Sequence, residues 1–119
     1  MRIPGPDHPI SIDANPRRVI VMFNGHKVAN TVRALKLTEA TYPGVNYIPR
    51  DDVDVSVLER TARSTNCPFK GDAAYFTIKV GERTAENSVW SYETPHAAVA
   101  AIAGHLAFYP DRVTVSEES

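Results

Sequence analysis

The stretch AAYFTIKVGERTAENSVWSY, which spans residues 73–92, determines more of the fold than any other part of the chain. Apolar and polar side chains alternate on both sides of Gly81-Glu82, as they do in a β-hairpin with one face in a core. A two-residue loop there would place Tyr75 opposite Ser88 and diagonally next to Trp90. The stretch therefore predicts two antiparallel strands with two different faces.

The two faces of this hairpin differ in chemistry. One face is apolar and predicts the main core; its members are Ala74, Phe76, Ile78, Val80, Ala85 and Val89. The other face mixes large aromatic rings with hydroxyls and charges; its members are Tyr75, Thr77, Lys79, Glu86, Ser88, Trp90 and Tyr92. Aromatic walls with a few directed polar groups are typical of small-molecule pockets. The mixed face predicts a cleft, and the alternative is a second small core in which the rings pack under loops.

A second hairpin is predicted near the start of the chain. The runs VIVMF (residues 19–23) and HKVAN (residues 26–30) are separated by Asn24-Gly25. Asn-Gly favours a type I′ turn, because both central residues need a positive φ. A two-residue turn would pair Phe23 with His26 and Val21 with Val28.

The rest of the chain predicts short strands and two short helices. Strands are expected over residues 31–37, 45–48, 105–109 and 113–115. One helix would begin at Asp52 or Asp54, and the other would have Thr94 as its N-cap and end at Gly104. The fold class is therefore all-β. The prolines before residue 17 predict an extended N-terminal arm over residues 1–16, followed by a single domain over 17–115 and a C-terminal tail over 116–119.

Composition excludes several classes of protein. The formal net charge is −1, with 13 basic and 14 acidic residues, and no basic run exceeds Arg17-Arg18. Nucleic-acid binders usually carry an excess of Lys and Arg, so we expect no nucleic-acid partner. The N-terminal sequence has no signal-peptide pattern, and no stretch is long and apolar enough for a membrane span. We therefore expect a cytoplasmic protein without a membrane partner. A monomer and a homodimer are both open.

Five short motifs in order resemble a known bacterial family. They are YIPRDDV (47–53), CPFKG (67–71), AAY (73–75), VWSY (89–92) and AFYP (107–110). Together they resemble the domain of unknown function family 427. The resemblance implies a β-tent of two small antiparallel sheets, similar to methionine sulfoxide reductase B and other Mss4-like domains. Descriptions of the family also carry a nucleotidyltransferase label, but the sequence has neither a glycine-rich phosphate loop nor the paired metal-binding carboxylates of such enzymes.

No metal or cofactor is expected. Many Mss4-like domains hold a structural zinc with two Cys-x-x-Cys pairs, whereas Cys67 is the one cysteine of this chain. His8, His26, His96 and His105 lack the spacing of a helical metal site.

We interpret the chain as a small-molecule-binding domain with a polar-aromatic cleft between two sheets. Tyr75, Trp90 and Tyr92 would form its walls, and Glu86 would lie on the same face. Lys70 and Arg50 could contact an anionic group, and Glu39 is a further possible partner.

Two other functions remain open at this stage. A small enzyme could use Cys67 as a nucleophile, or Glu86 as an acid or base, on a polar or phosphate-bearing substrate. The Cys-Pro context and the lack of a second thiol favour a structural role for Cys67 instead. The third possibility is a structural or protein-interaction domain without a ligand.

Overall fold

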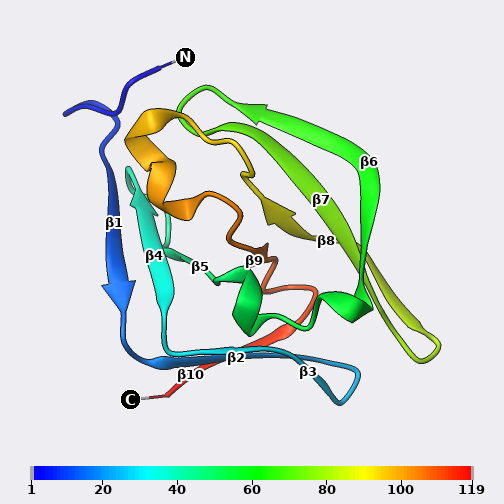
Figure 1. Ribbon diagram of the computed structural model, residues 1–119. Helices are drawn as coiled ribbons and strands as arrows, with labels where there is room; N and C mark the ends of the chain where they lie inside the picture. Colours follow the sequence, from blue (N-terminus) through cyan, green and yellow to red (C-terminus); the bar gives the residue numbers. More distant parts are fainter. Residues whose placement is uncertain (1, 119) are drawn as a thin grey trace.

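The computed structural model describes residues 2–118 and consists mainly of antiparallel β-strands, which confirms the all-β prediction. The strands form three sheets instead of the expected two. The strand orders are β1-β4-β5, β10-β2-β3 and β6-β7-β8-β9. Figure 1 shows the sheets as three sides of a frame, with the helical turn η3 across the fourth.

The strands have the following bounds. The first sheet contains β1 (Ile10–Asn15), β4 (Ala34–Glu39) and β5 (Val45–Tyr47), and the second contains β2 (Arg18–Phe23), β3 (His26–Thr31) and β10 (Thr114–Glu118). The third contains β6 (Leu58–Cys67), β7 (Gly71–Val80), β8 (Arg83–Ser91) and β9 (Ala107–Phe108).

Residues 10–15 of the predicted arm and residues 116–118 of the predicted tail take part in sheets. Strand β1 pairs with β4 over its whole length, and β10 pairs with β2. Ile10 and Ile12 of β1 pack against a buried cluster, a pattern that the prolines before them obscured. Strand β1 joins the β4-β5 hairpin and β10 joins the β2-β3 hairpin, so that each hairpin becomes a three-stranded sheet. The predicted arm and tail also include Met1 and Ser119, which lie outside the described residues.

The hairpin over residues 73–92 has the predicted two-residue loop, with Val80 opposite Arg83. Its register then shifts between Phe76 and Ile78, so that Tyr75 lies directly opposite Trp90 and not opposite Ser88. Extra residues in β8, including Asn87 with a φ of 50°, cause the shift. The shift spans two residues, so the faces keep their members and Tyr75 and Trp90 share a face, as predicted.

The first hairpin also turns at Asn24-Gly25, with φ values of 48° and 76°. Phe23 pairs with His26 as predicted. The pairing of Val21 with Val28 is wrong, because an irregularity in β3 places Ala29 opposite Val21.

We expect Gly25→Val to lower the free energy of unfolding by about 1 kcal/mol, because a β-branched residue resists the left-handed conformation that Gly25 adopts. Thermal unfolding measures the effect. Gly5→Val is the matched control, since a Cβ at Gly5 meets no atom within 4 Å and its φ is not in the left-handed region. Equal melting temperatures for the two variants would contradict the prediction.

Several parts of the chain differ from the prediction. Residues 31–37 are not one strand, because the Thr31 hydroxyl accepts a hydrogen bond from the Arg33 backbone N–H at 2.9 Å and turns the chain between β3 and β4. Strand β6 was missed, since its sequence LERTARSTNC has no apolar alternation. The helical segments are 3-10 turns: η1 (Arg50–Asp52), η2 (Val55–Val57) and η3 (Ala97–Ile102).

The caps of these turns also differ in part from the prediction. Asp54 caps η2 by accepting from the Ser56 backbone N–H at 3.1 Å. The N-cap of η3 is His96 and not Thr94, and His96 makes no side-chain capping bond.

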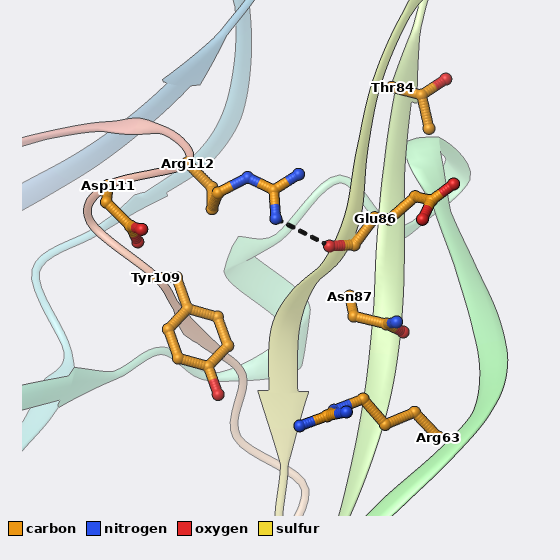
Figure 2. Close-up of a pocket in the computed structure, with 7 residues that line it drawn as sticks. All are labelled: Arg63, Thr84, Glu86, Asn87, Tyr109, Asp111 and Arg112. Atoms are coloured by element: carbon orange, nitrogen blue, oxygen red, sulfur yellow. Dashed lines mark hydrogen bonds between the residues drawn. The ribbon is translucent and has the colours of Figure 1, made fainter.

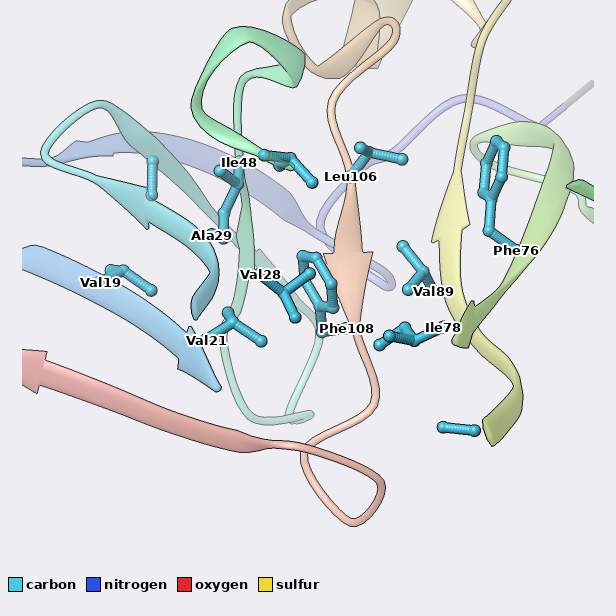
Figure 3. Packing of buried hydrophobic residues seen from close by; sticks show 13 residues of the cluster. Val19, Val21, Val28, Ala29, Ile48, Phe76, Ile78, Val89, Leu106 and Phe108 are labelled. Carbon is cyan, nitrogen blue, oxygen red and sulfur yellow. The ribbon is translucent and has the colours of Figure 1, made fainter. Parts of the chain in front are cut away.

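Two buried clusters lie on opposite faces of β7 and β8. Figure 3 shows the first, in which Phe76, Ile78 and Val89 meet apolar side chains of the second sheet. The second cluster contains Leu37, Tyr47, Ala73, Tyr75, Tyr92, Val99, Ile102 and Ala107. The apolar hairpin face therefore forms one core, and the aromatic face packs toward the β1-β4-β5 sheet.

Candidate functional site

A cavity of about 230 Å³ lies between the β1-β4-β5 sheet and the β6-β7-β8-β9 sheet. Strands β4 and β5 supply one wall, and the aromatic face of the 73–92 hairpin supplies the other. Its lining consists of Leu37, Glu39, Tyr42, Pro43, Val45, Tyr47, Lys70, Tyr75, Trp90, Tyr92 and Tyr109.

The aromatic content of this lining is unusual for the chain. All five tyrosines and the single tryptophan of the sequence line the cavity, whereas none of the four phenylalanines does. Trp90 and Tyr109 are tilted rings with centroids 4.5 Å apart, and Tyr47 meets the edge of Trp90 at 6.2 Å. Phenylalanine would suffice for a plain core. The selective use of rings that carry a polar atom therefore indicates a cavity with polar contacts to make.

Most of the polar ring atoms are already hydrogen-bonded. The Trp90 indole N–H donates to the Tyr47 hydroxyl at 3.2 Å, and the hydroxyls of Tyr75 and Thr65 are 2.9 Å apart. The Tyr92 hydroxyl makes no hydrogen bond to another group among residues 2–118, and Tyr92 is only 7% exposed. Ser91 Oγ is the one fully buried side-chain polar atom in this range that lacks a partner, so the Tyr92 oxygen is not fully buried, and water or a ligand in the cavity could satisfy it.

Burial strengthens the preference of two of these phenols for the neutral form. It raises the pKa of Tyr47 to about 12 and raises the pKa of Tyr92 as well. Burial also acts on Tyr75, but hydrogen bonds from Thr65 and Tyr109 and the nearby Arg63 outweigh it and lower the pKa of Tyr75. At neutral pH Tyr47 and Tyr92 are therefore neutral groups that can donate as well as accept a hydrogen bond.

A buried ion pair closes one end of the cavity. Lys70 forms a salt bridge with Glu39, and the side chains of the two residues are 10% and 17% exposed. His8 Nε2 lies 2.7 Å from the other carboxylate oxygen of Glu39, and the His8 ring stacks on Phe69 with centroids 3.9 Å apart. Burial alone would raise the pKa of Glu39, but the hydrogen bonds from Lys70 and His8 together hold that pKa below its ordinary value.

The loop between β6 and β7 positions Lys70. The Lys70 backbone N–H donates to the Cys67 carbonyl at 3.2 Å, which closes a tight turn. Gly71 follows with a φ of 109°, and a Cβ there would contact the backbone of Thr94 and Pro95 at 3.6 Å. The turn places the Lys70 ammonium 5.8 Å from the centroid of the Tyr92 ring.

The structure brings together four of the six predicted ligand-binding residues: Tyr75, Trp90, Tyr92 and Lys70 all line the cavity. Arg50 lies elsewhere, because its guanidinium is 5.9 Å from the ring of Phe76, on the opposite face of β7. Glu86 lines a separate groove.

Cys67, the candidate nucleophile, is a partly buried free cysteine that packs against the aromatic cluster. It does not line the cavity.

Sequence reasoning missed three tyrosines of the lining and the role of His8. Tyr47 and Tyr109 lie in the YIPRDDV and AFYP motifs. These motifs were the only sequence feature that could have pointed to Tyr47 and Tyr109, because the hairpin pattern extends only over residues 73–92. Tyr42 lies in a turn and is 64% exposed, so its sequence context marked it only as a loop residue.

Within residues 2–118, no group of three or more His, Cys, Asp or Glu side chains is arranged to hold a metal ion. His26 pairs instead with Asp54 at 2.7 Å. No helix in this part of the chain has the length and apolar character needed to cross a membrane.

Fold and site together define an all-β domain with a tyrosine-lined cavity between two antiparallel sheets. A family model described as Domain of unknown function (DUF427), with the label NTP_transf_9, matches residues 11–119, and the chain belongs to this family. The match includes most of β1 and all of β10, in agreement with their place in the sheets. No match was found among the curated proteins.

Proposed function

We propose that this protein binds a small, planar, ring-containing molecule in the cavity between its sheets. The observation that carries the proposal is the gathering of every tyrosine and the one tryptophan around a single cavity. Flat aromatic walls favour a flat ligand, which can stack on them or meet their edges. We also propose that the domain is a β-tent, in which a cleft opens where two sheets diverge.

The size and polarity of the cavity narrow the class of ligand. About 230 Å³ is below the range of drug-sized pockets, so the ring system should be small. The unpartnered Tyr92 hydroxyl can donate to a carbonyl or ring nitrogen, or accept from an N–H. Lys70 already pairs with Glu39, so the two form a neutral pair, and this end of the cavity favours a polar group of the ligand over a strongly charged one.

A fragment screen tests the proposal directly. Small planar ring compounds are titrated and followed by ligand-observed NMR and by the fluorescence of Trp90, the only tryptophan of the chain. We expect Val45→Phe to abolish binding, because Val45 lines the cavity and a larger ring would fill it. Val32→Phe is the matched control, since Val32 is 46% exposed and remote from the lining.

A milder variant guards against misfolding of Val45→Phe. Tyr92→Phe removes only the free hydroxyl and should weaken the binding of polar ring compounds by about fivefold to tenfold, which corresponds to the loss of one hydrogen bond. If no ring compound distinguishes the wild type from Val45→Phe and Tyr92→Phe, the proposed function is wrong.

A further inference from the structure

A second, larger groove adjoins the aromatic cavity. Its volume is about 590 Å³, and Figure 2 shows its lining residues, which are Arg63, Thr84, Glu86, Asn87, Tyr109, Asp111 and Arg112. Tyr109 lines both the groove and the cavity. The Tyr109 ring is therefore a wall that the cavity and the groove share.

Two arginines face this groove without an acidic partner. Within residues 2–118, neither Arg63 nor Arg112 has a carboxylate at ion-pair distance, whereas Arg33 and Arg60 pair with carboxylates at 3.0 and 2.8 Å. Figure 2 shows both guanidinium groups directed into the space beside the Tyr109 ring. Planar guanidinium forks with free N–H groups are suited to carboxylate and phosphate oxygens.

Other contacts hold the two arginines in place. One nitrogen of Arg112 donates to the Glu86 carbonyl oxygen at 3.1 Å, which leaves the other nitrogens available. The Arg63 guanidinium carbon lies 4.9 Å from the centroid of the Tyr75 ring. Because each side chain is held by a carbonyl or a ring and not by a carboxylate, its charge stays unneutralised by a direct ion pair.

The backbone irregularities explain how these residues reach the groove. The pairing of β6 with β7 shifts between Arg60 and Ser64, and the pairing of β7 with β8 shifts between Phe76 and Ile78. The two shifts lie on either side of Phe76 in β7, and Arg63 falls within the first. Such bulges change the direction of side chains and are common beside binding sites.

The acidic residues of the groove limit the expected affinity. Glu86 and Asp111 also belong to the lining, so the summed formal charge of the four charged side chains is zero. Figure 2 shows the Glu86 carboxylate directed away from both guanidinium groups. Recognition here should depend on the direction of the guanidinium N–H groups more than on a strong positive field.

From these contacts we propose that Arg63 and Arg112 form a subsite for an oxyanion, a carboxylate or a phosphate, carried by the ring-containing ligand. The ring would occupy the cavity and the oxyanion would lie on the other side of Tyr109. This inference rests on the proposed function for its ring, but the anion contacts can be tested alone.

The test compares phenol, benzoate and phenyl phosphate by NMR titration at low salt and at physiological salt. We expect at least one of the two anionic probes to bind the wild type about fivefold more tightly than phenol, a ratio that exposed ion pairs can supply. Arg63→Gln combined with Arg112→Gln should remove this preference and leave phenol binding unchanged. Arg83→Gln is the matched control, because Arg83 is an exposed residue of β8 outside the groove.

Two results would overturn the subsite. One is equal affinity of the wild type for phenol and both anionic probes, and the other is an equal loss of preference in Arg83→Gln, which would indicate bulk charge alone. If none of the ring probes binds, the proposed function fails for these rings and inorganic phosphate decides the subsite. Phosphate-induced shifts of the lining residues Thr84, Asn87 and Tyr109 that disappear in the double variant would support it, and the absence of such shifts would refute it.

Discussion

Lys70→Met is expected to lower the free energy of unfolding at pH 7 by about 2 kcal/mol, because it leaves the Glu39 carboxylate in a mostly buried position without its ammonium partner. Glu39 keeps its contact with His8 and some exposure, so the cost is below that of a fully buried pair. Urea denaturation with two-state analysis measures the change.

A double variant and a surface pair serve as controls. Lys70→Met combined with Glu39→Met should be more stable than Lys70→Met alone, because no charge is then left unpaired. Lys79→Met breaks the exposed pair with Glu59, whose side chains are 54% and 61% exposed, and should cost less than about 1 kcal/mol. A double variant less stable than Lys70→Met would contradict the role of the ion pair.

The same ion pair predicts a pH dependence. The folded protein holds the pKa of Glu39 below its ordinary value of 4.5. A group with a lowered folded-state pKa contributes stability above its unfolded-state pKa and loses it as the pH falls through the folded-state pKa. The stability difference between the wild type and Lys70→Met should therefore be constant near neutrality and shrink below about pH 4.5. A difference that grows with acid would contradict this assignment.

Leu106→Ala is expected to cost about 3 kcal/mol of unfolding free energy, within the range for large-to-small changes in a core. Leu106 is completely buried and belongs to the first core cluster, which Figure 3 shows. Its backbone exchanges two hydrogen bonds of 2.8 Å with Ile48, which ties the segment before β9 to the end of β5. Because this bridge holds the backbone, the structure cannot easily collapse into the space left by the removed atoms.

Thermal unfolding should show a fall of roughly 10 °C or more for Leu106→Ala. Ile3→Ala is the control, since Ile3 is 76% exposed, and its change should stay within about 0.5 kcal/mol. A Leu106→Ala variant as stable as Ile3→Ala would show that this position does not bear on the core.

Local sequence patterns were sufficient to predict both hairpins and the two faces of the 73–92 hairpin. Asn24-Gly25 and Gly81-Glu82 form two-residue loops because glycine and asparagine accept a positive φ, a preference that acts within a few residues. The even periodicity of the 73–92 stretch separated Phe76 and Ile78 from Tyr75 and Trp90, and the structure keeps this separation. A property that depends on neighbours along the chain can be read from the sequence.

The bulges were beyond such patterns. The shift that places Trp90 opposite Tyr75 depends on how β7 pairs with both β6 and β8. Strand β6 has no apolar alternation from which a strand could be predicted. The edge strands β1 and β10 depend in the same way on the partners β4 and β2 that accept them.

The amino-acid sequence was enough to predict the fold class, the family, the two hairpins and the aromatic face with Tyr75, Trp90 and Tyr92. The packing of the sheets was needed to see that Tyr47 and Tyr109 complete the cavity, that Lys70 is neutralised by Glu39, and that Arg50 and Glu86 lie outside it. The difference follows from the range of the interactions. Alternation and turn preferences act over a few residues, whereas the cavity forms between sheets whose strands come from distant parts of the chain, as for Lys70 and Glu39, 31 residues apart.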